Sequence, residues 1–161
     1  MFKLGIITIS DSASIGKRND SSGKVISDIF KKNESIQEVF YKIIPDDIDT
    51  ISSYLIELSD NHIADIIITT GGTGLGPRDL TPEATKNVLD KEIPGITEAM
   101  RLETLKKTNL SMLSRGISGL RKKCLIINLP GSPKAVSECM EIIEPVLEHA
   151  LTIISGKTSH K

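Results

Sequence analysis

A glycine-rich run is the strongest chemical signal in the chain. It reads TTGGTGLGPRDLTPEAT and starts at Thr69. Glycine lets the backbone approach a ligand closely, and successive backbone N–H groups in such a loop form a concave site for an anion. A tight strand-to-helix connection would also use glycine, but four glycines in six residues exceed what a turn requires. We expect this loop to bind an anion through Gly71, Gly72, Thr73 and Gly74.

Two familiar nucleotide signatures are missing from this run. A Walker A loop needs Lys followed by Ser or Thr after its last glycine, and neither follows here. A dinucleotide fingerprint needs a third glycine three residues after the second, where Pro77 stands. Any phosphate would therefore be held in a different arrangement.

Two carboxylates stand where they could hold a divalent cation. Asp79 follows the glycine-rich run, and Asp46 follows Pro45 at the end of an expected strand. Carboxylate oxygens are ligands that Mg²⁺ prefers. Asp79 could equally be an exposed carboxylate at a helix entry, and Asp46 could be a helix cap. Spacing alone leaves both alternatives open for each residue.

Further polar residues follow other expected strands and turns. Hydroxyls or charges at these places could line a ligand pocket, or they could serve turns and helix caps. No Ser-His-Asp set can be identified, so nothing requires covalent catalysis. These further candidates are Ser10, Asp11, Arg78, Ser114, Arg115, Gly131 and Ser132.

The elements that must position these residues alternate between strand and helix patterns. β-branched and apolar runs predict strands over residues 3–9, 38–44, 65–69 and 124–129. Apolar residues at helical spacing predict helices that open near residues 20, 48, 81, 96 and 133. Residues 113–119 are expected to be extended.

Proline positions predict where several helices start or are interrupted. Thr81 and Ser132 each precede a proline and are expected to cap a helix. The Pro94-Gly95 pair is expected to break the chain before the helix at 96–107, and Pro145 to interrupt the last helix.

Alternating strands and helices predict a three-layer α/β/α fold with a mostly parallel sheet flanked by helices. Ligands in such folds bind at the carboxyl ends of the strands. The loops after Ile9, Thr69 and Leu129 should therefore meet there. The 161 residues fit one domain over residues 1–156, followed by a polar C-terminal tail over residues 157–161.

Composition argues against several classes of protein. The net charge is −1, from 20 Lys and Arg against 21 Asp and Glu, which disfavours a generic nucleic-acid or anionic-membrane binder. The apolar stretches fall far short of the roughly 20 residues that span a bilayer. Cys124 and Cys139 lack metal-ligand spacing and fit apolar packing in a reducing compartment. We expect a cytoplasmic protein without nucleic-acid or membrane partners.

Six motifs stand in order over nearly the whole chain: TISDS at Thr8, D-x-SG at Asp20, IPD at Ile44, the glycine-rich run, MLSR at Met112 and LPGS at Leu129. Together they resemble the motifs of the molybdopterin adenylyltransferases, which include the G domains of gephyrin and its plant counterpart. The combination is far more specific than any single motif. A related paralogue group keeps the glycine loop but varies the PRD and IPD segments, whereas both are intact here.

The resemblance implies an enzyme that joins AMP from Mg·ATP to the terminal phosphate of molybdopterin and releases pyrophosphate. It implies that residues 71–74 cradle phosphate and that Asp79 and Asp46 are catalytic and hold Mg²⁺, directly or through water. The seven further candidates above would line the substrate pocket. It also implies a homotrimer and docking with a molybdenum-insertion protein. The alternative is a non-catalytic molybdopterin-binding or scaffolding paralogue.

Overall fold

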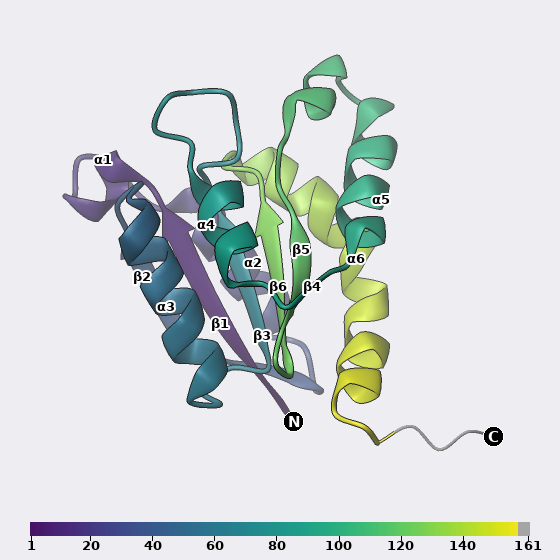
Figure 1. The fold of residues 1–161 in the computed structure, drawn as a ribbon. Coiled ribbons are helices and arrows are strands. Elements are labelled where there is room, and N and C mark those ends of the chain that lie inside the picture. The colour runs from purple at the N-terminus through teal and green to yellow at the C-terminus, as the bar shows by residue number, and fades with distance from the viewer. Residues whose placement is uncertain (158–161) are drawn as a thin grey trace.

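The computed structural model describes residues 1–157, and most of the expected polar tail, residues 158–161, lies outside them. A six-stranded sheet runs through the described part of the chain (Figure 1). The strand order is β2-β1-β3-β6-β5-β4; β1 pairs in parallel with β2 and β3, β3 in parallel with β6, and β5 antiparallel with β6 and β4. The strands are β1 (Phe2–Ile9), β2 (Ile36–Ile44), β3 (Ile66–Thr70), β4 (Lys91–Glu92), β5 (Ser118–Arg121) and β6 (Cys124–Leu129).

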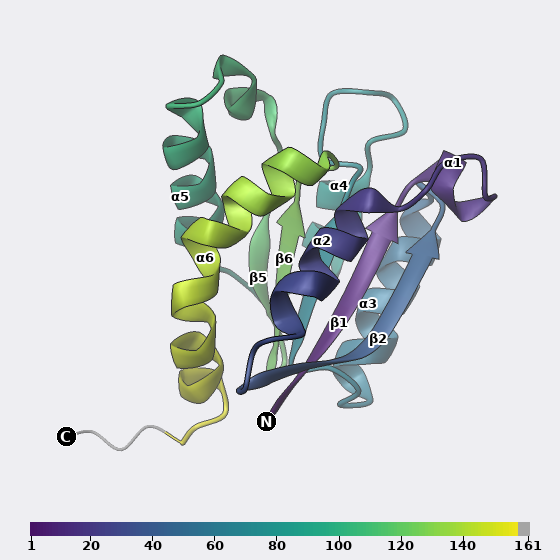
Figure 2. The same ribbon diagram turned by 180° about the vertical axis from the view of Figure 1, so that it is seen from behind.

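Helices cover both faces of this sheet. Helices α3 and α4 lie on the face that Figure 1 turns toward the viewer, and α2 and α6 cross the opposite face in Figure 2. Helix α5 packs beside α6. The predicted three-layer α/β/α fold is confirmed. The helices are α1 (Asp11–Ser14), α2 (Ser21–Phe30), α3 (Ile48–Asp60), α4 (Thr81–Val88), α5 (Pro94–Leu105), the 3₁₀ helix η1 (Asn109–Leu113) and α6 (Pro133–Ile154).

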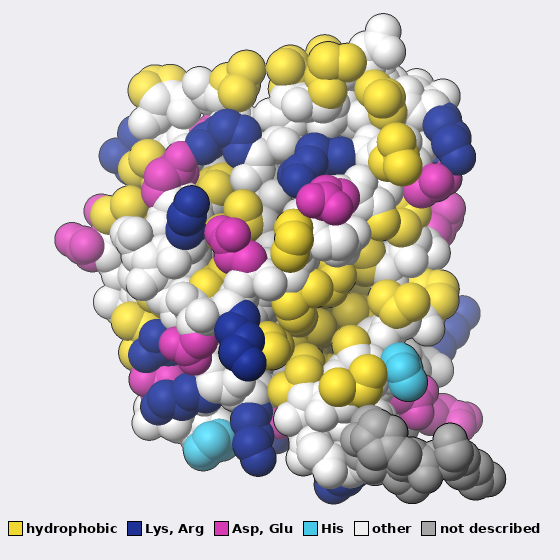
Figure 3. Space-filling model, turned by 45° about the vertical axis from the view of Figure 1, so that its right-hand side comes forward, with side chains coloured by type: hydrophobic (Ala, Val, Ile, Leu, Met, Phe, Trp, Pro, Cys, Tyr) yellow, Lys and Arg dark blue, Asp and Glu magenta, His cyan; other side chains and the backbone are white. Residues whose placement is uncertain are grey.

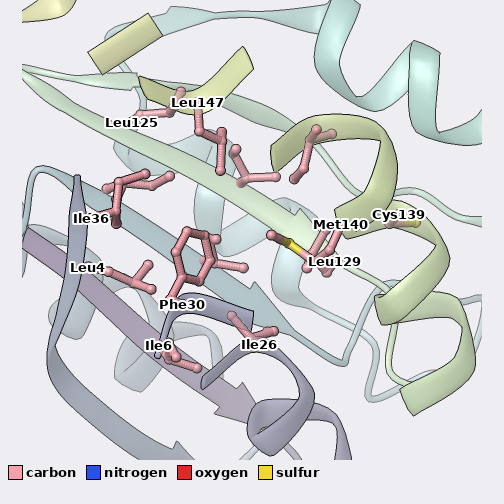
Figure 4. Close-up of a cluster of buried hydrophobic side chains, with 14 of the residues drawn as sticks. Leu4, Ile6, Ile26, Phe30, Ile36, Leu125, Leu129, Cys139, Met140 and Leu147 are labelled. Carbon is pink, nitrogen blue, oxygen red and sulfur yellow. The ribbon is translucent and has the colours of Figure 1, made fainter. Parts of the chain in front are cut away.

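Two hydrophobic cores lie on opposite faces of the sheet because successive side chains of a strand point to opposite sides. On β1, Leu4 and Ile6 join the core under α2 and α6, while Ile7 joins the core under α3 and α4. Figure 4 shows the first core, where Phe30 and Leu147 pack over the strands. The central strands are buried on both faces, which explains their unbroken apolar sequences.

The structure corrects the predicted start of α4. Thr81 does not cap this helix but is its first residue, and the cap position, Leu80, makes no side-chain hydrogen bond. The Oγ1 of Thr81 instead donates to the carbonyl oxygen of Gly71 at 2.9 Å. A contact between the first residue of α4 and the start of the glycine-rich run takes the place of the local cap.

The structure also corrects two predicted proline effects. Pro94 is the first residue of α5 rather than a break before it, because the first turn of a helix needs no N–H from that residue. Pro145 does not interrupt α6, which continues through it while buried residues on either side hold the helix to the core. Figure 2 shows the helix bending along its length, as proline commonly causes.

The segment after α5 differs from its predicted extended form in part. Residues 109–113 form η1, the backbone is extended at Ser114, and the strand β5 begins at Ser118. The predicted cap of α6 is confirmed, because the Ser132 side chain accepts a hydrogen bond from the backbone N–H of Ala135 at 3.1 Å.

The strand order creates a crevice at one edge of the sheet. The chain steps from β1 outward to β2 and then returns across β1 to β3. The connections that leave β1 and β3 therefore run in opposite directions, which makes a topological switch point between these two strands. Ligands bind at such points in open α/β sheets. Thr8 lies beside Thr70, and Thr70 beside Leu129, so the loops after β1, β3 and β6 meet as predicted. No helix within residues 1–157 has the length and apolar character needed to cross a membrane.

Candidate active site

A polar cavity of about 350 Å³ opens at the carboxyl ends of β1, β3 and β6. Its walls come from the ends of β1 and β3, the loops that follow β1, β2 and β6, both ends of the glycine loop (residues 71–79), and the entries of α2 and α6. Seven of the predicted site residues line it. They are Ser10, Asp46, Gly71, Gly72, Asp79, Gly131 and Ser132.

Two helix N-termini line this cavity. Ser21 and Ser22 begin α2, and Pro133 begins α6. The first turn of a helix has backbone N–H groups without helical partners and carries a partial positive charge. Arg18 adds a cation to the lining. These N–H groups and Arg18 therefore favour an anionic ligand such as phosphate on their side of the cavity.

Close packing within the glycine loop requires glycine at two positions. Gly71 and Gly72 have φ of 97° and 67°, in the left-handed region. A Cβ at Gly71 would overlap the carbonyl oxygen of Ile9, and one at Gly72 would overlap the Thr81 hydroxyl and lie 3.1 Å from Asp46 Oδ1. Any side chain here would disturb the edge of the cavity.

Reciprocal hydrogen bonds join Asp46 to Asp11 and tie the loop after β2 to the loop after β1. The N–H of Asp11 donates to Asp46 Oδ2 at 2.8 Å, and the N–H of Asp46 donates to Asp11 Oδ1 at 3.0 Å. The helix cap considered for Asp46 is made by its neighbour Asp47, whose carboxylate accepts from the N–H of Thr50 at 2.9 Å. Asp46 is thereby free to face the cavity.

The electrostatic surroundings of Asp46 favour its neutral form. Burial is the main cause that raises the pKa of Asp46, and the negative charges of Asp11 and Asp79 raise it further. The hydrogen bond from the backbone N–H of Asp11 lowers this pKa, but by less. A cation bound beside these carboxylates would offset this cost.

Asp79 reaches the cavity from the far end of the glycine loop. Its Oδ2 accepts a hydrogen bond from the N–H of Gly76 at 2.8 Å, and its own N–H donates to the carbonyl oxygen of Gly76 at 3.0 Å. The carboxylate is thus held by a local turn of the loop.

Asp46 and Asp79 have the donor chemistry that Mg²⁺ requires. Both carboxylates line one cavity, and the charge of Asp79 acts on Asp46. Mg²⁺ is usually bound through one or two carboxylates together with substrate phosphates and water. Within residues 1–157, no group of three or more His, Cys, Asp or Glu side chains is arranged to hold a metal ion. The two carboxylates therefore fit an ion that shares its ligands with a phosphate substrate.

Five of the predicted site residues lie outside the polar cavity: Asp11, Thr73, Gly74, Arg78 and Arg115. Arg78 makes a bidentate pair with Asp11, with Nε–Oδ2 and Nη2–Oδ1 distances of 3.1 Å, and this pair lowers the pKa of Asp11. The backbone oxygens of Thr73 and Gly74 accept hydrogen bonds from Arg115 at 2.9 and 2.8 Å. These five residues hold the loops of the site to one another.

Asp20 lines the polar cavity but was not among the predicted site residues. Its Oδ2 accepts hydrogen bonds from Thr8 Oγ1 at 2.7 Å and from the Tyr41 hydroxyl, and its Oδ1 accepts from the N–H of Gly23 at 2.9 Å. Burial and the bond to Asp20 raise the pKa of Tyr41. The D-x-SG motif was the available signal, since a Cβ at Gly23 would overlap this cluster.

A second, mostly apolar cavity of about 220 Å³ lies beside the first and shares Ser132 with it. Helix α5, η1 and the start of α6 form its walls, with Met100, Ala135 and Cys139 among the lining side chains. Ser114, predicted as a site residue, lines this cavity rather than the polar one. Burial raises the pKa of the Cys139 thiol to about 11, so this group adds no charge.

Comparison with known proteins places these features in a family. The family described as "Probable molybdopterin binding domain" matches residues 5–149. The chain belongs to this family.

Relatives that match most of this chain carry the name of an enzyme. The molybdopterin adenylyltransferase of Helicobacter pylori strain J99 is 42% identical over 154 residues, which cover 95% of this chain and 88% of the relative. The molybdopterin adenylyltransferase of Escherichia coli K12 is 38% identical over 140 residues, which cover 86% of this chain and 72% of the relative. The resemblance drawn from the six motifs is thereby confirmed.

Solved structures of the family share the fold described above. The molybdopterin biosynthesis enzyme MoaB from Thermus thermophilus superposes with a TM-score of 0.91 at 44% identity, covering 97% of this chain and 98% of that one. The molybdopterin biosynthesis Mog protein from Mycobacterium ulcerans gives a TM-score of 0.89 at 36% identity, covering 96% and 99%.

Proposed function

We propose that the protein is a molybdopterin adenylyltransferase, which joins the AMP moiety of ATP to the terminal phosphate of molybdopterin and releases pyrophosphate. The polar cavity carries this proposal, because a glycine loop, two helix N-termini and two carboxylates converge on it. Relatives that bear this name at 42% and 38% identity over most of the chain support it.

The reaction needs two anions held together. An oxygen of the molybdopterin phosphate attacks the α-phosphorus of ATP, a new P–O bond forms, and the bond to the β-phosphate breaks to release pyrophosphate. Such a transfer needs positioning and charge stabilisation rather than a protein nucleophile. Backbone N–H groups of the glycine loop and of the α2 and α6 entries would bind the phosphate oxygens, with Arg18 as an added cation.

Asp46 and Asp79 are the residues we assign to Mg²⁺, bound directly or through water. When bound, the ion would offset the repulsion between phosphates and stabilise the pyrophosphate leaving group. Asp46 is held for this task by the N–H of Asp11, and Asp79 by the N–H of Gly76, each at 2.8 Å.

The apolar cavity suits the ring system of molybdopterin. Ser132 belongs to both cavities, so a ligand with a ring in the apolar cavity and a phosphate in the polar one would pass this residue. Small-molecule sites commonly combine an apolar wall with a few placed polar groups. Ser114 would supply such a group to the ring.

A homotrimer in the cytoplasm, able to dock a molybdenum-insertion protein, completes the proposal. Figure 3 brings the α5 side of the molecule forward and shows hydrophobic side chains gathered there around a hollow. Exposed apolar surface of this kind supports contact with other chains. The exposed apolar side chains of α5 and η1 are Leu102, Leu105, Leu110, Met112 and Leu113.

The alternative, a non-catalytic molybdopterin-binding or scaffolding paralogue, would need no carboxylate pair at the phosphate site. Asp46 and Asp79 both line the polar cavity, and this favours the enzyme. We also propose that residues 1–156 form a single domain.

The test is direct product formation. Purified protein is mixed with molybdopterin, ATP and Mg²⁺, and adenylyl-molybdopterin and pyrophosphate are quantified. We expect equal amounts of both products, and none when Mg²⁺ is removed by a chelator. Binding of molybdopterin without product would instead identify the carrier or scaffold.

A further inference from the structure

Arg115 is a half-buried cation that lies outside both cavities and contacts the glycine loop. It follows η1 and Ser114 in the chain. Its backbone N–H donates to the carbonyl oxygen of Thr73 at 2.9 Å. The residue is therefore anchored to the loop even without its side chain.

The guanidinium of Arg115 joins the two ends of an exposed excursion in this loop. Its Nε donates to the carbonyl oxygen of Gly74 at 2.8 Å, and its Nη2 donates to that of Asp79 at 2.7 Å. Residues 75–78, which lie between these two carbonyls, are exposed, and the loop projects beyond α4 in Figure 1. One planar group thus closes the base of the projecting segment.

Glu83, in the first turn of α4, orients this guanidinium. Its carboxylate forms an ion pair with Arg115 Nη1, and the hydrogen bond from Arg115 lowers the pKa of Glu83. The charge of Arg115 is thereby matched by a neighbour that does not line the polar cavity. This geometry differs from the direct substrate contact that the MLSR motif implied.

We propose that Arg115 is a positioning residue, which holds the base of the glycine loop closed and so places the Asp79 carboxylate in the polar cavity. Its kinetic consequence rests on the proposed function. The carbonyl oxygen of Asp79 accepts a hydrogen bond from Arg115, and the carboxylate belongs to the same residue. A shift of the guanidinium would therefore move the carboxylate as well. A misplacement of about 1 Å in a catalytic group can cost on the order of a hundredfold in rate.

Lysine cannot replace this arginine. A guanidinium offers several N–H donors in a fixed plane, whereas an ammonium on a flexible chain is a point charge. Arg115→Lys therefore keeps the charge and removes the bridge between the carbonyls of Gly74 and Asp79.

Arg121 offers a matched control. It also pairs with a carboxylate, Asp60, at 2.8 Å through Nε and Nη2, and it donates to the carbonyl oxygen of Val88 at 3.0 Å. It does not line the polar cavity. Arg121→Lys thus makes the same chemical change away from the glycine loop.

The experiment compares the two lysine variants in the adenylylation assay. We expect Arg115→Lys to lower kcat by about ten- to a hundredfold, to leave the KM for molybdopterin within about twofold, and to raise the Mg²⁺ concentration needed for half-maximal rate. Arg121→Lys should lower Tm without these kinetic changes. Should Arg115→Lys fail to fold, Glu83→Gln tests the same bridge and should shift kcat and the Mg²⁺ response in the same direction.

A readout without substrate separates this proposal from the proposed function. Amide hydrogen exchange at residues 74–79 should be faster in Arg115→Lys and unchanged in Arg121→Lys. Unchanged exchange in Arg115→Lys, or equal losses of kcat in both lysine variants, would overturn the positioning role. If the wild-type protein makes no product while exchange responds as expected, the function is wrong and the positioning role stands.

Discussion

The two cavities meet at Ser132, yet they are built from different parts of the fold. The polar cavity is formed by loops that leave parallel strands and by helix entries, where backbone N–H groups lack partners. The apolar cavity is formed along α5, η1 and α6, where the helices satisfy their own backbone groups and side chains such as Met100 and Cys139 form the wall. Unpaired backbone groups at strand and helix ends thus form the polar cavity, which we assign to phosphate, and side chains on helix faces form the apolar cavity, which we assign to the ring.

The largest expected effect comes from the polar half. We expect Asp79→Asn to lower turnover by on the order of a hundredfold, because a preorganised charge beside the reacting phosphates is lost. The fold should survive, since the amide oxygen of Asn can still accept the hydrogen bond from Gly76. Steady-state product formation and a thermal melt measure the two quantities. Asp28→Asn, in an exposed pair on α2, is the control, and near-normal turnover of Asp79→Asn would remove this residue from the mechanism.

A substitution in the apolar cavity should act by filling the cavity rather than by removing a charge. Ala135→Phe adds a ring to the wall of the apolar cavity. We expect molybdopterin affinity to fall by at least about tenfold, equivalent to about 1.4 kcal/mol, while ATP affinity stays unchanged. Titration calorimetry with each ligand measures this. Val146→Phe, at an exposed position on the same helix, is the control, and equal losses for both ligands would mean that the cavities do not divide the substrates as we propose.

A medium effect concerns stability and pH at the paired carboxylates. Because the pKa of Asp46 is raised, its carboxyl adds stability that is fully present below the ordinary pKa of about 4 and is lost as pH rises through the folded-state value. The pKa of Asp11 is lowered, so its contribution is present above the ordinary pKa and is lost as pH falls through its folded-state value.

The measurement for this pair is urea unfolding of three proteins between about pH 3 and 7. The stability advantage of wild type over Asp46→Asn should shrink as pH rises, and its advantage over Asp11→Asn should grow. If the stability advantage changed with pH in the same direction for both variants, the pKa values of Asp46 and Asp11 would not be shifted in opposite directions.

The smallest effect is expected at the rim of the site. Arg78 and Asp11 form a pair whose side chains are 63% and 47% exposed, and exposed pairs contribute little to stability. Arg78→Ala should lower Tm by no more than about 2 °C. Arg121→Ala breaks a pair that is 20% and 25% exposed and should lower Tm further. A larger fall for Arg78→Ala would indicate that the exposed pair, rather than Arg115, holds the loop.

Several elements could be predicted because their signals are local. The apolar runs that became β1, β3 and β6 are continuous, since these strands are buried on both faces. Ser132 capped α6 as predicted because a hydroxyl next to Pro133 meets only local backbone donors. The adjacent carboxylates Asp46 and Asp47 could not be told apart in this way, because the hydrogen bond that selects Asp46 comes from Asp11 in another loop.

Local sequence signals were enough to predict the alternation of strands and helices, the glycine loop and the motifs that place the chain in its family. These depend on local backbone preferences and on the order of residues along the chain. The folded structure was needed to show which polar side chains line the cavity and which, like Arg115, hold its walls. That division depends on contacts between loops far apart in the sequence, which meet because the strand order reverses between β1 and β3.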